Sequence, residues 1–425
     1  MKALTPVLSA LKAPAKDAAL LAMAHALREN AKALAEANQK DLEEAEVVGL
    51  EKPLMARLKF QGEKIAGAAE GLEALANLPD PVGRTLSARE LDQGLELFQV
   101  TCPLGVVAMI FESRPDALVQ MAGLALKSGN AVILKGGSEA KHSNRILADL
   151  LHTAAVAAGL PRGWLFLAET RDEVKTLLEL DDSIDLIIPR GSNEFVQYIM
   201  KNTTIPVLGH AEGLCHVYVD GNASVEKAIP LIIDSKTQYV AVCNAVETLL
   251  VHRDIAPFLL PPLRMALESR AVELRGDPET RKYIPGIREA DEQDWETEYL
   301  DLILSIKIVG TLDEAITHIN TYGSKHTDAI VTEDKTTAER FMNDVDSANV
   351  FWNASTRFAD GFRYGLGAEV GVSTAKVHAR GPVGLEGLVI YKWKLYGKGQ
   401  VVAHYAGSDP KPFTHKELPL SGWNR

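Results

Sequence analysis

The chain has few cysteines and no long hydrophobic run, and each scarcity excludes a class of protein. Three cysteines, Cys102, Cys215 and Cys243, are too few in 425 residues for a disulfide framework, so we expect a reducing, cytoplasmic location. No apolar run reaches the roughly 20 residues that a membrane span needs. The segment 1–21 lacks the continuous apolar core of a signal peptide.

Positive charge is also scarce. The formal net charge of −12 disfavours nucleic acid as a partner, because phosphate binding requires a basic stripe and the sequence contains none. A small anionic substrate stays possible, since one local cluster of arginines can outweigh a global surplus of acid.

Two common site motifs are missing. No G-x-G-x-x-G follows a strand-like segment, so the usual dinucleotide fingerprint is absent. The histidines are dispersed and show no zinc spacing, among them His210, His216, His318, His326 and His378. Acidic residues lie mostly on helical, solvated faces, so no carboxylate pair stands out.

What the sequence does contain is a repeated alternation of apolar strands and helices. Residues 16–80 are rich in helix formers, and from about residue 105 strand-like and helical segments alternate. This pattern predicts a doubly wound α/β domain, in which ligands bind outside the carboxyl ends of the strands. A second, smaller α/β unit is predicted from about residue 240, which agrees with the two or three domains expected at this length.

Two strand-to-helix turns are candidates for phosphate binding. One carries Lys135 and two glycines before a helix whose N-cap is predicted to be Ser138, and the other carries Gly191 and Ser192. Each offers backbone N–H groups and the positive end of a helix dipole. The alternative is that both are ordinary turns of the fold.

Cys243, in the stretch 238–248, has two readings. A free cysteine is commonly a small buried hydrophobe. Its position at the predicted junction of two α/β units and its neighbour Asn244, whose amide can stabilise an oxyanion, favour a nucleophile instead. The residues themselves leave both readings open, whereas Cys102 and Cys215 lie in apolar runs and are interpreted as packing residues.

The stretch 353–387 is polar, rich in glycine and arginine, and unusually long for a loop. Arg357, Arg363 and Arg380 can clamp carboxylate or phosphate oxygens by bidentate pairing. The alternative interpretation is a solvated linker between domains.

Several segments together resemble the gamma-glutamyl phosphate reductase family, a divergent branch of the aldehyde dehydrogenase superfamily. They are 102–140, 205–220, 239–252, 312–332 and 353–387. The resemblance covers nearly the whole chain. It implies an aldehyde dehydrogenase-like α/β fold with two doubly wound α/β domains plus oligomerisation strands.

The resemblance also implies domain boundaries. We expect a nucleotide-binding domain at 1–236, with an oligomerisation strand near 85–100, and a catalytic domain at 237–365 that carries the cysteine. The segment 366–425 is expected to return to the first domain and to the oligomerisation strands.

The same resemblance assigns roles to single residues. Cys243 becomes the nucleophile, with Asn244 at the oxyanion. The implied NADP(H)-binding residues are Lys135, Ser138 and Glu139 near the adenosine ribose, Gly191 and Ser192 near the pyrophosphate, and Glu298 near the nicotinamide ribose.

The chain departs from the superfamily pattern at three places. Val240 to Val242 replace a proline and small residues before the cysteine, and Ser113-Arg114 replaces an asparagine before Pro115. Glu212 falls near the general base of hydrolytic relatives in a different local pattern, and we predict that it has no catalytic role.

The implied activity is NADPH-dependent reduction of L-glutamate 5-phosphate to the semialdehyde, through a cysteine thioacyl intermediate, in proline biosynthesis. The implied partners are this anionic substrate, a glutamate kinase and further copies of the chain. The predicted substrate-binding residues are Arg114, His326 (with Lys325), Arg357, Arg363 and Arg380. The alternatives are another aldehyde dehydrogenase reaction, namely semialdehyde oxidation or coenzyme A acylation, or a catalytically silent nucleotide-binding scaffold.

Overall fold

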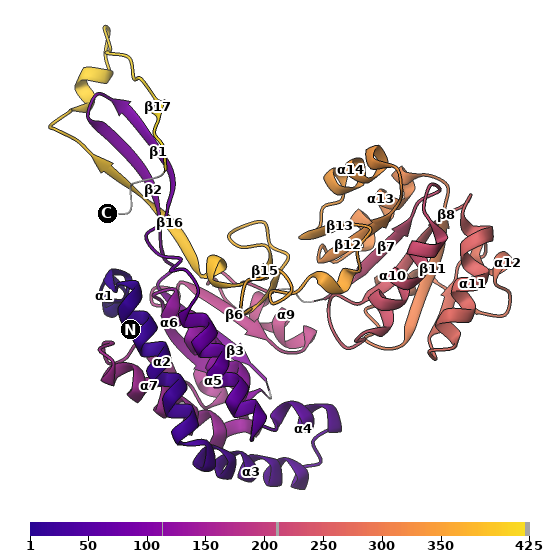
Figure 1. Cartoon of the computed structure of the whole chain (residues 1–425), viewed down its shortest axis with the longest axis horizontal. Helices are drawn as coiled ribbons and strands as arrows, with labels where there is room; N and C mark the ends of the chain where they lie inside the picture. Colours follow the sequence, from indigo (N-terminus) through magenta and orange to yellow (C-terminus); the bar gives the residue numbers. More distant parts are fainter. Residues whose placement is uncertain (113, 210–211, 421–425) are drawn as a thin grey trace. The chain divides into compact units, whose positions relative to one another are not determined.

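The computed structural model describes residues 1–112, 114–209 and 212–420. The chain forms two compact units (Figure 1). The first unit comprises residues 1–191, 198–208 and 383–425, and the second comprises 192–197 and 209–382.

The first unit contains a parallel sheet of order β5-β4-β3-β6. Its strands are β3 (Val106–Phe111), β4 (Ala131–Lys135), β5 (Leu165–Leu167) and β6 (Leu186–Arg190). Every residue of β3 and β4 is buried, as expected for parallel strands that are covered on both faces.

Helices of the first unit pack on one another and on this sheet. They are α1 (Thr5–Ala10), α2 (Ala13–Glu29), α3 (Ala31–Val47), α4 (Lys52–Leu58), α5 (Glu63–Ala76), α6 (Pro115–Lys127), α7 (Lys141–Ala157) and α8 (Arg171–Leu178). Helix α9 (Asn193–Lys201) is divided between the units after Gln197. The apolar face predicted for residues 20–34 is the buried face of α2 and α3, where Leu20, Met23, Leu27 and Leu34 are almost fully enclosed. The apolar spacing of this segment was therefore a reliable guide to the helix interior.

The first unit also contains an antiparallel sheet of order β16-β2-β1-β17. Its strands are β1 (Thr85–Asp92), β2 (Leu95–Pro103), β16 (Val389–Tyr396) and β17 (Lys416–Glu417). The tail of the chain thus pairs with residues about 300 positions earlier, with Val389 opposite Pro103 and Tyr396 opposite Glu96. The C-terminal segment thus returns to the first unit.

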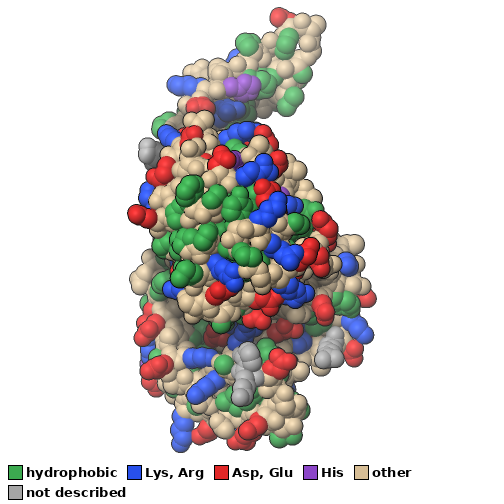
Figure 2. Space-filling view, turned by 90° about the vertical axis from the view of Figure 1, so that its right-hand side faces the viewer, with side chains coloured by type: hydrophobic (Ala, Val, Ile, Leu, Met, Phe, Trp, Pro, Cys, Tyr) green, Lys and Arg blue, Asp and Glu red, His purple; other side chains and the backbone are tan. Residues whose placement is uncertain are grey.

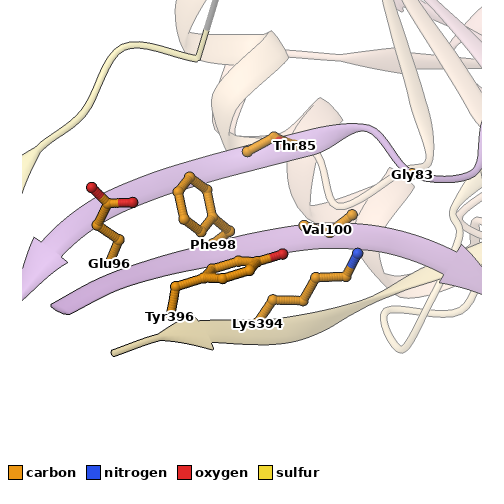
Figure 3. A pocket seen from close by; sticks show the side chains of 7 residues that line it. All are labelled: Gly83, Thr85, Glu96, Phe98, Val100, Lys394 and Tyr396. Carbon is orange, nitrogen blue, oxygen red and sulfur yellow. The ribbon is translucent and has the colours of Figure 1, made fainter. Parts of the chain in front are cut away.

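A small pocket lies on this antiparallel sheet (Figure 3). It is lined by Gly83, Thr85, Glu96, Phe98, Val100, Lys394 and Tyr396. The rings of Phe98 and Tyr396 meet edge to face in it, with centroids 5.5 Å apart.

On β16, the edge strand, Trp393 and Leu395 are more than half exposed. Large apolar side chains on an exposed edge strand are what a subunit interface needs, so the predicted oligomerisation role of these strands stays a prediction with a physical basis.

The second unit is built on a parallel sheet of order β10-β9-β11-β8-β7-β12-β13. Its strands are β7 (Cys215–Val219), β8 (Val246–His252), β9 (Glu273–Gly276), β10 (Arg288–Glu289), β11 (Ile303–Val309), β12 (Thr327–Val331) and β13 (Asn349–Trp352). Its helices are α10 (Val225–Thr237), α11 (Ala256–Glu268), α12 (Thr280–Tyr283), α13 (Leu312–Tyr322) and α14 (Lys335–Asp344). Two short strands follow, β14 (Gly371–Ser373) and β15 (Gly381–Val383).

Alternate residues of the central strand β7 serve opposite cores. Val217 and Val219 belong to the core formed with α10 and α11, whereas Tyr218 belongs to the core formed with α13 and α14. Because successive side chains of a strand point to opposite faces, the sheet is covered by helices on both sides (Figure 1). This arrangement confirms the predicted doubly wound architecture.

The unit boundary differs from the predicted one at 236/237. β7 and α10 belong to the second unit, because β7 pairs with β8 and β12 in the seven-stranded sheet. The C-terminal return to the first unit likewise begins at Val383 and not at residue 366. The apolar residues 205–209, whose composition is typical of a strand, contribute only a bridge between Val207 and Ile187. A continuous alternation of strands and helices contains no signal for the point at which one sheet ends and the next begins.

Acidic and basic side chains are interspersed over the face of the molecule shown in Figure 2. Within the described residues, no helix is both long and apolar enough to cross a bilayer.

Candidate active site

Cys243 lies in the turn between α10, which ends at Thr237, and β8, which begins at Val246. It is partly exposed, whereas Asn244 and Ala245 after it are buried. The strands of this sheet are all parallel, so the first residues of β8, β7, β12 and β13 share one edge. We call this edge the amino edge of the second unit, and it is defined by Val246, Cys215, Thr327 and Asn349.

Gly213, just before β7, and Cys215, the first residue of β7, hold the backbone of Cys243. A Cβ atom placed on Gly213 would overlap the Cα and carbonyl group of Cys243, so this position accepts only glycine without movement of the turn. The thiol of Cys215 donates to the carbonyl oxygen of Cys243 at 3.1 Å. Burial raises the pKa of Cys215 well above its usual value, so this thiol stays protonated and able to donate.

The arginine-rich stretch closes over the same turn. The side-chain amide of Asn244 donates to the carbonyl oxygen of Ala359 at 2.8 Å. Arg357 is 8% exposed and donates through Nε to the side-chain oxygen of Gln238 at 2.9 Å. The stretch is thus bonded to Gln238 before Cys243 and to Asn244 after it.

Arg357 and Arg363 form a pair of cations at this place. Arg363 donates to the main-chain oxygen of Arg357 at 2.9 Å and lies 3.5 Å from Asp360. Burial and the nearby Arg363 lower the pKa of Arg357, and the interaction with Cys243 acts in the opposite direction. The hydrogen bonds from Arg357 to Gln238 and from Asn244 to Ala359 place this pair of cations at the turn that carries Cys243.

The other predicted residues of the second unit also lie along the amino edge. His326 immediately precedes β12 and is fully buried, with Nδ1 2.8 Å from the hydroxyl of Thr327 and 3.9 Å from the thiol of Cys215. Arg380 binds the side chain of Asp346 at 3.1 Å and its carbonyl oxygen at 3.2 Å. His326 is therefore a buried neighbour of the cysteine turn, whereas Arg380 lies in a separate cluster of charges.

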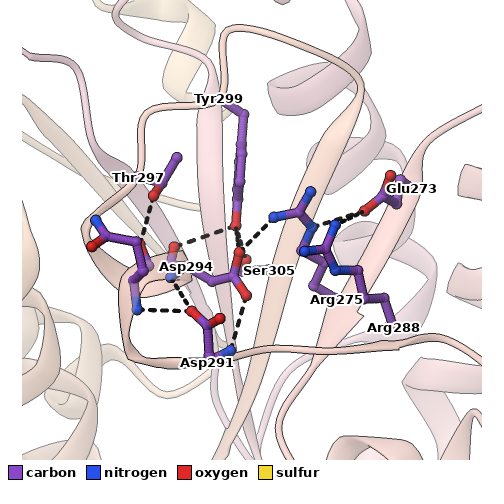
Figure 4. A network of polar contacts seen from close by, with 9 residues as sticks. Glu273, Arg275, Arg288, Asp291, Asp294, Thr297, Tyr299 and Ser305 are labelled. Carbon is purple, nitrogen blue, oxygen red and sulfur yellow. Dashed lines mark hydrogen bonds and ion pairs between the residues drawn. The ribbon is translucent and has the colours of Figure 1, made fainter.

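Glu298 precedes β11, the strand beside β8, and accepts a hydrogen bond from Asn193 at 2.8 Å. The next residue anchors this segment: the hydroxyl of Tyr299 lies 2.7 Å from both Asp294 and Ser305 (Figure 4). Arg275 completes the network by pairing with Asp294 at 2.6 Å. The segment that carries Glu298 is thus fixed by a polar network.

A buried ion pair closes the base of the cysteine turn. Lys236, in the last turn of α10, lies 2.5 Å from Glu247 of β8, and neither side chain is exposed to solvent. Burial raises the pKa of Glu247 to about 7 and lowers that of Lys236. The second oxygen of Glu247 accepts from the main-chain N–H of Leu300 at 3.3 Å, so the pair also connects this turn with the Glu298 segment.

The first predicted phosphate turn, at Lys135 to Glu139, lies at the carboxyl end of β4. Lys135 is buried and donates to the carbonyl oxygen of Gly136, and Ser138 is exposed. The N-cap prediction for Ser138 was wrong: residues 138–140 form a short 3-10 helix, and α7 begins at Lys141 with Ala140 as its N-cap.

The N-terminus of α7 is already occupied by a carboxylate. Asp41 of α3 accepts from the main-chain N–H groups of His142 at 2.9 Å and Ser143 at 2.8 Å. An anion at this helix end would compete with Asp41, so α7 does not offer the phosphate site that its turn suggested.

The second predicted phosphate turn, at Gly191 and Ser192, leads directly into α9. Ser192 precedes α9, where its carbonyl and hydroxyl oxygens accept from the N–H groups of Val196 at 3.0 Å and Phe195 at 3.4 Å. Gly191 is exposed at the carboxyl end of β6. Arg114 is exposed at the N-cap of α6, after β3, and its guanidinium lies 3.9 Å from Asp116.

Two residues named in the sequence analysis lie outside the part of the chain that the structure describes. They are Ser113 and His210. Glu212, for which no catalytic role was predicted, is exposed and accepts from Gln197 at 3.4 Å.

Sequence reasoning missed several residues that position the site, namely Asp41, Gly213, Lys236, Gln238, Glu247 and Asp346. Glu247 gave a signal that could have been used, because a charged residue interrupts the apolar run of β8. The others required contacts between distant segments.

Comparison with known proteins defines the class. The model of the aldehyde dehydrogenase family matches residues 2–297. The chain therefore belongs to the aldehyde dehydrogenase family, and an acetylating aldehyde dehydrogenase from Geobacillus thermoglucosidasius shares its fold at 21% identity, with a TM-score of 0.64.

Within that family, the chain is similar to gamma-glutamyl phosphate reductases. It is 58% identical to those of Ruminiclostridium cellulolyticum and Pelotomaculum thermopropionicum, over 97% of this chain and 95% and 94% of theirs. The crystal structure of the gamma-glutamyl phosphate reductase from Thermotoga maritima superposes with a TM-score of 0.92 at 39% identity, covering 94% of this chain and 97% of that one.

Proposed function

We propose that this protein reduces L-glutamate 5-phosphate to L-glutamate 5-semialdehyde with release of phosphate, the reductive step of proline biosynthesis. The observation that carries the proposal is the position of Arg357 and Arg363 at the turn of a partly exposed Cys243, in a chain 58% identical to gamma-glutamyl phosphate reductases. A nucleophilic sulfur beside two guanidinium groups suits an acyl phosphate, whose leaving group carries negative charge.

In the first step, the thiolate of Cys243 attacks the acyl carbon and expels phosphate, which leaves a thioester on the sulfur. Phosphate is a good leaving group, so its expulsion needs charge stabilisation by Arg357 and Arg363 more than proton transfer. No water has to be activated in this reaction, and the exposed position of Glu212 is consistent with that.

The carbonyl oxygen gains negative charge during the attack. The main-chain N–H of Cys243 and the second N–H of the Asn244 amide are our candidates for stabilising it, since the amide has two donors and Ala359 accepts one of them. One such donor contributes about 3–4 kcal/mol in other enzymes.

When bound, a nicotinamide cofactor would supply the hydride that reduces the thioester on Cys243 to the aldehyde, and the sulfur would leave as the free thiolate. The residues proposed to hold the cofactor are Lys135, Ser138, Glu139, Gly191, Ser192 and Glu298. The capping of α7 by Asp41 favours the turn before α9 for the pyrophosphate. Preference for NADP over NAD, the kinase partner, the homo-oligomer and a cytoplasmic location stay predictions.

The test is an assay of NADP⁺ reduction by L-glutamate 5-semialdehyde with and without inorganic phosphate. We expect turnover that requires phosphate. Turnover that requires coenzyme A, or that proceeds with neither, would support the other aldehyde dehydrogenase reactions and overturn the proposal.

Cys243→Ala should lower turnover by at least about 10⁴-fold, because the covalent step is lost, while NADPH binding followed by fluorescence is retained. Cys102→Ala, in β2, is the matched control and should keep full activity. A silent scaffold would instead show no turnover in the unmodified protein and no substrate protection of Cys243 against thiol labelling.

A further inference from the structure

Asp346, in the connection between α14 and β13, is surrounded by three cations. Lys376 lies 2.7 Å from its carboxylate, Arg380 3.1 Å and Lys325 3.6 Å. We call these four residues the Asp346 cluster. One carboxylate shared by three cations leaves a surplus of positive charge that further anionic groups can neutralise.

The cluster is accessible and has an unused donor. The side chains of Asp346 and Arg380 are 34% and 27% exposed, so a small ligand can reach both without unfolding the segment. The Nε–H of Arg380 is buried without a hydrogen-bond partner among the described residues. A guanidinium has five donors in a planar fork, and a free Nε–H is the edge that pairs with a carboxylate.

The backbone around the cluster is strained at two residues. Lys325 and His378 have φ values of 64° and 66°, in the left-handed region that side chains other than glycine and asparagine avoid. Such strain is kept where the surrounding structure requires a particular side-chain position. The strained residues are Lys325, two positions before β12, and His378, between Lys376 and Arg380.

The cluster lies on the same edge of the sheet as the cysteine. Lys325 precedes β12, its carbonyl oxygen accepts from Ala348 before β13 at 2.9 Å, and Cys243 precedes β8. Only β7 separates β8 from β12. Neighbouring strands are about 4.8 Å apart, so the start of β12 lies about 10 Å from that of β8.

This spacing suits the two ends of the proposed substrate. L-Glutamate 5-phosphate has its acyl phosphate at one end and an α-ammonium and an α-carboxylate at the other. The four carbon–carbon bonds between the acyl and carboxylate carbons, each about 1.5 Å long, extend over about 5 Å. An attack distance of about 3 Å and a hydrogen bond of about 3 Å bring the reach from sulfur to a carboxylate partner to about 11 Å.

We propose that the Asp346 cluster binds the α-amino-acid head of the substrate, with Asp346 accepting from the α-ammonium and Arg380 donating to the α-carboxylate. Lys325 and Lys376 hold the carboxylate of Asp346 from its other contacts. The phosphate end is left to Arg357 and Arg363 beside Cys243. This inference rests on the proposed function and adds the residues that select an amino-acid substrate.

The test compares two aldehydes in the phosphate-dependent reduction of NADP⁺: L-glutamate 5-semialdehyde and glutarate semialdehyde, which lacks the amino group. Each KM is divided by that of the unmodified protein for the same aldehyde, so cyclisation of the amino aldehyde cancels. Asp346→Asn should raise the KM for the amino aldehyde about 10- to 100-fold, as expected for the loss of a charged hydrogen bond, and change that for glutarate semialdehyde less than threefold. Arg380→Gln should raise the KM for both aldehydes, since both carry the carboxylate.

Matched controls are Asp313→Asn and Arg340→Gln, an ion pair between α13 and α14 outside the cluster, and both should keep all KM values. An Asp346→Asn variant that still prefers the amino aldehyde to the original degree would overturn the inference. So would an Arg380→Gln variant in which the KM for phosphate rises and that for the aldehydes does not, because the cluster would then be the phosphate site. Absence of phosphate-dependent turnover in the unmodified protein is a different result, and it would overturn the proposed function itself.

Discussion

The two units are both parallel sheets covered by helices, yet their candidate residues lie at opposite strand ends. In the first unit, Lys135 ends β4, and Gly191 and Arg114 follow β6 and β3, at the carboxyl ends where ligands of open α/β sheets usually bind. In the second unit, Cys243 precedes β8, and Lys325 and Asp346 of the cluster precede β12 and β13, at the amino ends. One architecture therefore supports two arrangements of functional groups.

The difference has a physical reason. A carboxyl-end turn leads into a helix N-terminus, which supplies N–H groups and positive potential to a ligand that carries phosphate. An amino-end turn follows a helix C-terminus, which supplies neither. The second unit replaces them with side chains: Arg357 and Arg363 provide the positive charge, and Gly213, Cys215 and the Lys236–Glu247 pair fix the backbone.

The largest expected effect is on this buried pair. Lys236→Met leaves Glu247 buried without its partner, so we expect the free energy of unfolding to fall by about 3–5 kcal/mol, measured by urea denaturation. The comparison in the first unit is Lys127→Met: Asp17, the partner of Lys127, is 31% exposed and can be hydrated, so the loss should be smaller.

The double variant Lys236→Met, Glu247→Gln should recover most of this stability, because it removes both charges and keeps an acceptor for the N–H of Leu300. Equal losses for Lys236→Met and Lys127→Met would contradict the special importance of the amino-edge pair.

A second test compares two glycines. Gly213→Ala forces the backbone of Cys243 to move, and a displacement of about 1 Å at a reacting group costs about 100-fold in kcat. Gly137→Ala, at the carboxyl edge of the first unit, meets only the side chain of Glu139, which can rotate away, so it should change the KM for NADPH a few-fold at most. Steady-state kinetics of both variants decide, and an unchanged kcat in Gly213→Ala would count against our description of the turn.

The capped helix of the first unit gives a smaller effect. Asp41→Ala removes the acceptor for two N–H groups of α7, so the free energy of unfolding should fall by about 1–2 kcal/mol. If α9 and not α7 faces the pyrophosphate, the KM for NADPH stays unchanged in this variant. A lower KM would mean that removal of Asp41 opens a phosphate site at α7, contrary to our assignment.

The smallest effect is expected in the antiparallel sheet, outside both edges. The ammonium of Lys411 and the hydroxyl of Tyr405 lower the pKa of Asp92 to about 2. A lowered folded pKa adds stability above the unfolded value of about 3.9, and this contribution is lost as the pH falls through about 2. Asp92→Asn should therefore weaken protection of residues 401–417 from hydrogen exchange at pH 6, with little difference from the unmodified protein near pH 2. The KM for NADPH and the KM for the aldehyde should be unaffected in this variant. A change in either KM would link this sheet to the candidate cofactor or substrate site.

The sequence alone determined the class of the chain and predicted its reacting atom. Alternating apolar segments predicted two α/β units, because burial on both sheet faces requires continuous apolar strands. The segment around Cys243, with the arginine-rich stretch 353–387, predicted the nucleophile and its cationic neighbours, which are local in the chain and chemically distinctive.

Tertiary structure alone decided which edge of each sheet carries the candidate residues and which other residues hold them in place. The order of strands in a sheet cannot be derived from the sequence of each strand. Nothing local therefore indicated that β7 joins the second sheet, or that β12, which follows Lys325, is separated from β8 by β7 alone. Asp41 and Gly213 act on α7 and Cys243 through contacts that span 101 and 30 positions of the chain. Such contacts depend on how elements pack, and packing is a property of the whole core.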